Sequence, residues 1–254
     1  MKQFVYHDFT QSIKGLTTTR EGGFSSAPFM SFNLAYHVGD NDELVKKNRS
    51  LLLNELGIKE DHLILTYQTH STVVKKVTRD DLGGGMNSFN TGIPADALYT
   101  YEKGVAIGVF HADCVPIMFC DSKRGLLGVI HASNQNSVQH FTKRCLEYLK
   151  QNENVNTEEL LVYIGPYLSF SHNEIGTEAR DQLLKQGFSK CLKETTGRIF
   201  LDTYFLNYLD LVDSGVLPER ITVSPFCTFE NPKLFFSVKN GAITGRMISL
   251  IINK

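Results

Sequence analysis

Two histidines and one cysteine have the residue types and the positions in the chain to form a catalytic centre. His70, Cys114 and His131 each follow a run of residues that is typical of a β-strand. Because each stands at a strand end, their side chains could converge on one edge of the fold. Two imidazoles and one thiolate are typical ligands of a catalytic zinc ion, which leaves its fourth position to water or substrate.

The spacing of these residues also allows a second interpretation. No Cys-x-x-Cys or His-Glu-x-x-His motif accompanies them, although such motifs are what make a zinc site recognisable in a sequence. In the second interpretation, Cys114 is a small buried residue and the two histidines are hydrogen-bonded residues at strand ends.

A polar segment follows His131 and precedes a predicted helix. It reads Ser133-Asn134-Gln135-Asn136-Ser137, and we expect Asn136 or Ser137 to cap the helix. A helix N-terminus presents free N–H groups and the positive end of the helix dipole, which suits an anion such as phosphate. Capping alone would also explain these polar residues.

Hydrophobic periodicity and turn residues predict a mixture of helices and strands. Helices are expected at 42–56, 137–150, 178–186 and 202–214, with Asp202 as an N-cap and with Gly57 and Gly215 as C-terminal stops. Strands are expected at 63–67, 72–77, 97–100, 105–110, 115–120, 126–130, 161–164, 221–223 and 247–251, with a hairpin turn at 122–125. The strands come in clusters separated by helices, so the predicted fold class is α+β with mixed sheets. No linker interrupts the pattern, and we expect one domain over residues 1–254.

Two of the expected strands are near copies of each other. Residues 107–112 read Ile-Gly-Val-Phe-His-Ala, and residues 127–132 read Leu-Gly-Val-Ile-His-Ala. If both lie in one sheet, they bring His111 and His131 to the same edge. The simpler interpretation is two similar buried strands.

The composition is that of an ordinary globular protein. The chain has 254 residues, 42% of them hydrophobic and 21% charged, and its formal net charge is -1. This balance provides no electrostatic basis for binding nucleic acid, and no apolar run is long enough for a membrane helix. The first residues lack the apolar core of a signal peptide, and five scattered cysteines suit a reducing compartment. The expected location is therefore the cytoplasm.

A series of short motifs makes the chain resemble one bacterial family. The motifs are, in chain order, Thr17-Thr18-Thr19-Arg20-Glu21-Gly22-Gly23-Phe24-Ser25, Ser31-Phe32-Asn33-Leu34, His37-Val38-Gly39-Asp40, Gln68-Thr69-His70, Asp96-Ala97-Leu98-Tyr99, Ala112-Asp113-Cys114-Val115-Pro116, Ile164-Gly165-Pro166, Cys227-Thr228, Phe235-Phe236-Ser237 and Thr244-Gly245-Arg246. From about Thr17 to Ile251, the chain resembles the family once labelled multicopper polyphenol oxidase, or laccase-like, and now described as purine nucleoside phosphorylases.

The resemblance implies a fold, a metal and an activity. The fold would be a compact sandwich of mixed β-sheets flanked by helices, similar to that of a bacterial toxin with a Cys/His hydrolase site. Zinc would be held by His70, Cys114 and His131, with copper as a less favoured alternative. The activity would be phosphorolysis of adenosine, inosine and methylthioadenosine, with some deamination of adenosine.

Four further side chains are candidates to contact the purine nucleoside and the phosphate. Arg49 and Arg246 are candidate contacts of the anion, and Asn33 and Asp96 are candidate polar contacts. Either arginine could instead lie on a solvated face of its helix or strand.

Two segments depart from the family pattern. After the third ligand, the family usually reads His-Ala-Gly-Trp-Arg-Gly, whereas this chain reads His131-Ala132-Ser133-Asn134-Gln135-Asn136 and contains no Trp. Further on, a Ser-Tyr-Arg-Arg run is replaced by Ser237-Val238-Lys239-Asn240. Since arginine pairs bidentately with anions and Gln135 carries no charge, both changes reduce the positive charge available to phosphate.

These departures keep other functions open. A hydrolase could use zinc-activated water against C6 of adenosine, or a metal-free Cys114 thiolate with His131 against an amide in a cell-wall precursor. A non-catalytic relative could keep the zinc and bind without turnover. A copper oxidase is disfavoured, because multicopper centres commonly use His-x-His pairs and the eight histidines form none. The preferred nucleoside and the oligomeric state stay open.

Overall fold

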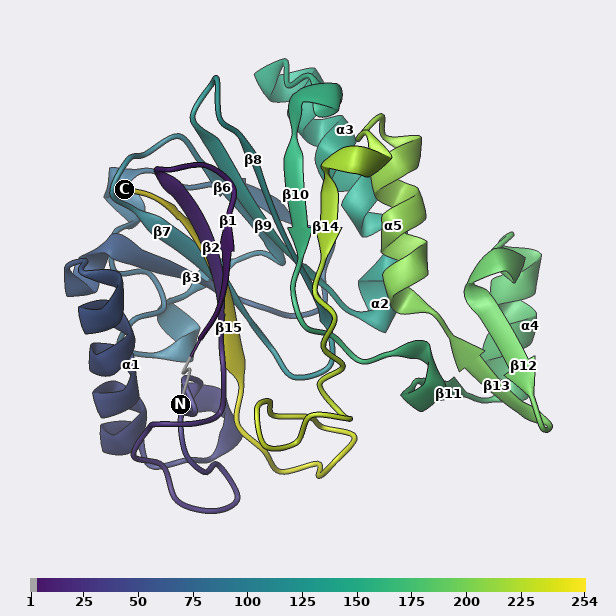
Figure 1. Cartoon of the computed structure of the whole chain (residues 1–254), viewed down its shortest axis with the longest axis horizontal. Helices are drawn as coiled ribbons and strands as arrows, with labels where there is room; N and C mark the ends of the chain where they lie inside the picture. The colour runs from purple at the N-terminus through teal and green to yellow at the C-terminus, as the bar shows by residue number, and fades with distance from the viewer. Residues whose placement is uncertain (1–3) are drawn as a thin grey trace.

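Two large β-sheets are stacked in the computed structural model, which describes residues 4–254 (Figure 1). Within these residues, the first sheet has six strands in the order β1-β2-β15-β7-β3-β5. Their bounds are β1 Phe4–Asp8, β2 Ile13–Thr18, β15 Met247–Asn253, β7 Ala106–His111, β3 Leu63–Tyr67 and β5 Ile93–Pro94. The second sheet also has six, in the order β14-β10-β8-β9-β6-β4. These are β14 Ile221–Val223, β10 Leu161–Ile164, β8 Val115–Asp121, β9 Leu126–Ala132, β6 Ala97–Thr100 and β4 Val74–Lys76.

Helices cover the outer faces of both sheets, which gives four layers (Figure 1). Helix α1 (Asp42–Leu56) packs on the first sheet, and α3 (Phe141–Glu153) and α5 (Thr203–Asp213) pack on the second. A single turn, α2 (Asn134–Ser137), precedes α3. No helix among residues 4–254 is long and apolar enough to cross a membrane.

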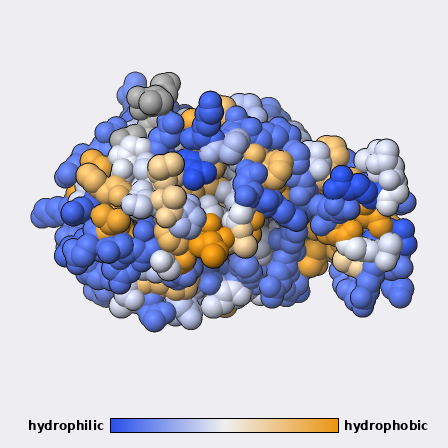
Figure 2. Space-filling model, turned by 90° about the horizontal axis from the view of Figure 1, so that it is seen from below, coloured by the Kyte–Doolittle hydropathy of each residue, from blue (hydrophilic) through white to orange (hydrophobic). Residues whose placement is uncertain are grey.

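A small lobe projects from this body (Figure 1). It contains α4 (Thr177–Lys185) and a three-stranded sheet in the order β11-β13-β12, with bounds Glu174–Ile175, Arg198–Leu201 and Leu192–Thr195. Figure 2, which views the molecule from below, shows hydrophobic residues gathered near the middle of the body and again on this lobe.

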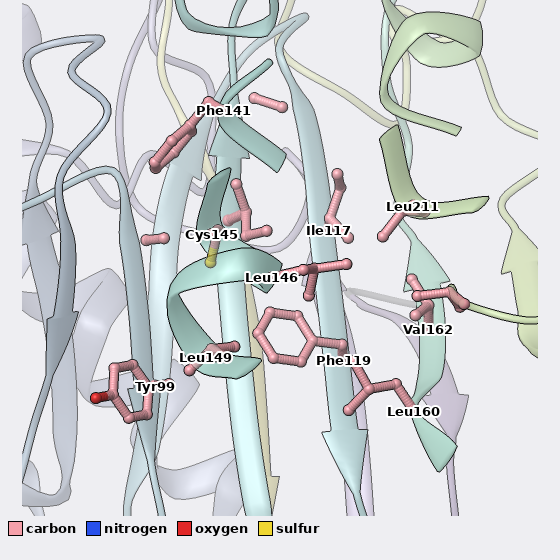
Figure 3. Packing of buried hydrophobic residues seen from close by; sticks show 14 of the residues in the cluster. Tyr99, Ile117, Phe119, Phe141, Cys145, Leu146, Leu149, Leu160, Val162 and Leu211 are labelled. Atoms are coloured by element: carbon pink, nitrogen blue, oxygen red, sulfur yellow. The ribbon is translucent and has the colours of Figure 1, made fainter. Parts of the chain in front are cut away.

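The central strands have no solvent-facing side. Every residue of β7, β8, β9 and β15 is buried, because one face of each sheet meets the other sheet and the opposite face meets further layers. Figure 3 shows the outer core of the second sheet, where Leu146 and Leu149 of α3 lie beside Phe119 of β8, and Phe141 belongs to the same cluster further along the helix. Strands buried on both faces are near-continuous apolar runs, which is why the sequence predicted them.

The predicted fold class is confirmed: the structure is α+β, with mixed sheets flanked by helices. Each expected strand is present, the hairpin between β8 and β9 turns at Gly125 with a φ of 73°, and the side chain of Asp202 caps α5. All five cysteines are free thiols. The likeness to a toxin fold and the single domain over residues 1–254 stay predictions.

The helix expected over residues 137–150 is wrong at its start. His140 adopts a left-handed conformation with a φ of 55°, so α3 begins only at Phe141. The expected caps are also wrong, because Ser133 caps the preceding turn: its hydroxyl accepts from Asn136 N–H, and Asn136 Oδ1 accepts from Ser133 N–H. The four-residue α2 is too short to provide the helix dipole that the anion-binding expectation required.

Six strands among the described residues were not expected from the sequence: β1, β2, β5, β11, β12 and β13. In β2, the buried Thr17 has a hydroxyl that lies 2.7 Å from the Ser249 hydroxyl of β15. Polar side chains that find partners in a neighbouring strand interrupt the hydrophobic signal, since their burial depends on that neighbour.

Candidate metal centre and substrate pocket

The three candidate ligands meet at one end of the space between the two sheets. In β9, Leu127 and Val129 face the core between the sheets, so the two-residue period of a strand points His131 the same way. Cys114 lies in the connection that carries the chain from β7 to β8, and His70 lies beyond the end of β3. Their ligand atoms all lie within 4.8 Å of one another.

The strand pair 107–112 and 127–132 explains part of this convergence. β7 and β9 are two buried strands in different sheets, so they do not share the sheet that would by itself bring their ends together. Ile107 and Val109 of β7 nevertheless face the same inner core as Leu127 and Val129. The stacking of the sheets therefore brings His111 and His131 to the same pocket.

Asp96 fixes the orientation of His131. The buried His131 Nδ1–H donates to Asp96 Oδ1 at 2.8 Å, which leaves Nε2 free to act as the ligand atom. Asp96 Oδ2 accepts from the N–H of Thr69 and from both the N–H and the hydroxyl of Ser71. One carboxylate thus holds His131 together with the residues on either side of His70.

Asn136 reinforces the same connection. Its side-chain amide donates to the carbonyls of Ser71 and His131, at 3.1 and 3.0 Å. Its place in the sequence indicates only a candidate helix cap. Only the folded chain shows that it links the loops of two candidate ligands.

Asp113 holds Cys114 in place through a strained backbone. Its φ is 94°, a region that side-chain-bearing residues rarely occupy. Three hydrogen bonds stabilise this conformation: Thr228 Oγ1–H donates to Oδ1 at 2.7 Å, Lys239 N–H to Oδ2 at 3.0 Å, and Leu168 N–H to the carbonyl at 2.9 Å. The direction of the neighbouring Cys114 is therefore set by segments far away in the sequence.

The ionisation of the two histidines is displaced in opposite directions. Burial, and then the charge of His131, lowers the pKa of His70. Burial alone would lower the pKa of His131, but the Cys114 sulfur and the hydrogen bond to Asp96 outweigh it and raise that pKa to about 9. The surroundings of His131 therefore favour a positive charge at that position.

The donor set fits a metal ion of the zinc type. It consists of one sulfur and two imidazole nitrogens, and the carboxylate of Asp96 supports one imidazole from behind, as is common at such sites. His70 is exposed, Cys114 is half-buried and His131 is buried. A fourth coordination position of an ion held by these three residues could therefore be open to the pocket.

The pocket beside these ligands has a volume of about 620 Å³, within the range of small-molecule sites. One part of its wall is aromatic: the His37 and Phe89 ring centroids lie 3.9 Å apart, and those of Phe89 and Phe110 lie 6.1 Å apart. Lys239 and Arg246 add two cationic side chains to the lining. Nothing in the sequence marked Phe89 or Phe110 as pocket residues.

The other predicted contact residues have mixed positions. Arg246 lines the pocket, whereas Asn33, Arg49 and Asp96 do not. Asn33 Oδ1 accepts from the N–H of Arg246 at 2.9 Å and so positions that residue. Arg49 is buried, donates to the carbonyls of Leu34, Gly85 and Met86, and lies 4.4 Å from the ring centroid of Tyr36. In the structure, Asn33, Arg49 and Asp96 organise the surroundings of the pocket rather than its surface.

His111 also lines the pocket. Its Nε2 lies 2.8 Å from the Ser249 hydroxyl, while its Nδ1 is buried and has no hydrogen-bond partner among residues 4–254. A buried polar atom without a partner is costly, so this nitrogen is suited to a hydrogen bond with a molecule in the pocket.

Comparison with known proteins identifies the family. Residues 14–254 match the family described as multi-copper polyphenol oxidoreductase laccase, and the chain belongs to it. A relative named purine nucleoside phosphorylase YlmD, from Bacillus subtilis (strain 168), is 34% identical over 239 residues, which are 92% of this chain and 86% of the relative.

Solved structures agree with this membership. The crystal structure of YlmD from Geobacillus stearothermophilus has a TM-score of 0.91 and 32% sequence identity, and the match covers 96% of this chain and 93% of that chain. The hypothetical protein YfiH of Bacillus licheniformis also has a TM-score of 0.91, at 27% identity, over 98% of this chain and 99% of that chain.

Proposed function

We propose that this chain is a cytoplasmic, zinc-dependent purine nucleoside phosphorylase that cleaves adenosine, inosine and methylthioadenosine with phosphate. The observation that carries the proposal is the convergence of His70, Cys114 and His131 at a pocket lined by aromatic rings and two cations. The relatives named purine nucleoside phosphorylase support it.

The lining suits the charges that develop during this reaction. Cleavage of the N-glycosidic bond builds positive charge on the ribose and negative charge on the departing purine. Lys239 and Arg246 can hold the phosphate anion, and the aromatic wall of His37, Phe89 and Phe110 can stack on the purine. The unpartnered His111 Nδ1 offers a hydrogen bond that orients the nucleoside.

A zinc ion held by His70, Cys114 and His131 would supply positive charge that stabilises negative charge on the reacting groups. Asp96 maintains the Nδ1–H form of His131, and the hydrogen bonds to Asp113 hold Cys114 toward the other two ligands. Asp96 acts by position, since it does not line the pocket.

The test is an assay of purified, metal-quantified protein with inosine and adenosine, with and without phosphate. Hypoxanthine and ribose 1-phosphate should appear from inosine only when phosphate is present. His131→Ala should abolish turnover, whereas His62→Ala should not, because His62 pairs with Asp61 at the surface and does not line the pocket. No phosphate-dependent cleavage by zinc-loaded protein would reject the proposal.

Hydrolysis is a second candidate function, and it is favoured by Gln135. This neutral residue lines the pocket and hydrogen-bonds with His70, where the family usually carries an arginine. With less positive charge, the pocket binds the phosphate anion less strongly, so water becomes a relatively better nucleophile. Release of ammonia from adenosine without phosphate would support deamination, and cleavage of a cell-wall amide would support a Cys114 and His131 hydrolase.

A further inference from the structure

A second group of metal-ligating side chains lies outside the pocket. The ligand atoms of His172, Cys227 and Glu230 all lie within 4.8 Å of one another, and none of these residues lines the pocket described above. His172 ends a short 3-10 helix, and the other two belong to the connection between β14 and β15. We propose that these three residues bind a second divalent metal ion of the zinc class.

The sulfur of Cys227 has the surroundings of a thiolate ligand. It is only 7% exposed, yet it accepts hydrogen bonds from both the N–H and the hydroxyl of Ser169, at 3.3 and 3.2 Å. These two contacts fix the position of the sulfur, and a cysteine sulfur is a typical zinc ligand. A buried cysteine that served only as a small hydrophobic residue would not need two donors.

The other two ligands are already directed toward each other. His172 Nε2 lies 2.8 Å from Glu230 Oε1, and the imidazole is stacked on the ring of Phe229 with a centroid distance of 4.2 Å. Glu230 is 54% exposed, so an ion can enter from solvent, and water can complete its coordination. Sulfur and imidazole donors favour zinc over magnesium or calcium.

The backbone holds these ligands independently of an ion. Thr228 N–H donates to the carbonyl of Tyr167 at 2.9 Å, so the segments carrying His172 and Cys227 lie side by side. Asn231 donates to the Cys227 carbonyl through its side-chain amide, at 2.9 Å, and also through its N–H. This turn brings Glu230 to the same side as Cys227.

The two segments also support the first centre. Leu168, in one segment, and Thr228, in the other, both donate hydrogen bonds to Asp113, the strained neighbour of Cys114. An ion that joins His172 to Cys227 and Glu230 would therefore fix the loops that hold Asp113. The proposed role of the second ion is structural, and it does not depend on which reaction the pocket performs.

Metal stoichiometry of the full-length protein tests the proposal. After zinc loading and removal of loose metal, the wild-type chain should hold two equivalents, and Cys227→Ser and Cys114→Ser should each hold one. Cys191→Ser is the matched control, because Cys191 is a buried free thiol outside both groups, and it should hold two. One equivalent in the wild type, unchanged by Cys227→Ser, would overturn the second site.

Cobalt supplies a spectroscopic test within one variant. In Cys114→Ser, added cobalt should still produce a thiolate-to-cobalt charge-transfer band, which should vanish in the Cys114→Ser/Cys227→Ser double variant. Glu230→Gln, at an exposed position that should not disturb folding, should weaken cobalt binding in the Cys114→Ser background by at least about tenfold, since even outer-shell partners contribute that much. A missing band in Cys114→Ser, or a Glu230→Gln affinity equal to that of its parent, would refute the assignment.

Hydrogen exchange tests the structural role. In the Cys114→Ser background, zinc should slow amide exchange at residues 167–172 and 227–231. Exchange that is unchanged by a bound equivalent would show that the ion does not fix these loops.

Discussion

Replacing Asp96 with Asn should separate the metal affinity of the first centre from the stability of the fold. The carboxylate receives His131 Nδ1–H on Oδ1, and it receives three donors from Thr69 and Ser71 on Oδ2. An amide has only one acceptor oxygen, so Asp96→Asn cannot satisfy both sets. In a first arrangement, the NH₂ of the new amide faces Thr69 and Ser71, and their three donors lose their acceptor. In a second arrangement, the NH₂ faces His131 and donates to Nδ1. The imidazole must then carry its proton on Nε2, and this proton blocks the atom that would bind the metal.

The second arrangement leaves fewer buried donors unpaired, so we expect the variant to adopt it. The loss of the charge, which weakens the hydrogen bonds that this group makes, should cost about 1–3 kcal/mol of unfolding free energy. Removing the outer-shell partner of His131 should weaken zinc binding by about 10–100-fold.

Zinc affinity is measured by competition with a chromogenic chelator in the Cys227→Ser background, which keeps only the first centre, and stability is measured by urea unfolding in excess chelator. Asp121→Asn is the matched control, because Asp121 is also buried and accepts two backbone N–H groups, from Lys123 and Arg124, at the β8–β9 turn. It should leave zinc affinity unchanged. If Asp96→Asn binds zinc as tightly as the wild type, the orientation argument for Asp96 is wrong.

Three other predictions follow from the pocket and the core. Gln135→Arg restores a positive charge beside the pocket and should lower the KM for phosphate by about tenfold in the inosine assay; an unchanged phosphate KM would mean that the anion binds elsewhere. Burial lowers the pKa of His111 to about 3, below the value of about 6.5 in an unfolded chain. As the pH falls, the unfolded state therefore gains the proton first. The free energy of unfolding should fall by up to about 1.4 kcal/mol for each pH unit below about 6.5. His111→Leu should remove this contribution from the difference in urea stability between pH 7 and pH 5, and an identical difference in both proteins would contradict the assignment. Gly128→Ala would place a Cβ 2.0 Å from the buried Phe119 ring and should destabilise the protein by about 1–3 kcal/mol or more. The control is Gly176→Ala, whose Cβ would have nothing within 4 Å and should barely shift Tm. A Gly128→Ala Tm equal to that of the wild type would show that the ring can move.

Much of the secondary structure could be predicted because its signals are local. Helix α1 has the bounds that its apolar spacing and Gly57 indicate, since Gly57 adopts a left-handed φ of 65° as a C-cap. The start of α3 was missed because the conformation of His140 depends on a distant contact: its Nδ1 lies 2.7 Å from Asp210 Oδ1 in α5. No local pattern encodes that pairing.

The sequence by itself determined the chemistry that the candidate centre can offer. The residue types of His70, Cys114 and His131, and their places at the ends of apolar strands, indicate an imidazole and thiolate metal site. Residue type sets which atoms can bind a metal, and strand-end position depends on nearby residues.

Only the tertiary structure decided how these groups are arranged. The stacking of two sheets brings the three ligand atoms within 4.8 Å of one another, the carboxylate of Asp96 sets which nitrogen of His131 faces them, and distant loops hold Asp113 at a φ of 94°. The same packing places Arg49 against backbone carbonyls and brings Phe89 and Phe110 to the pocket wall. These outcomes depend on contacts between segments far apart in the chain, whereas periodicity and turn residues report only on neighbours.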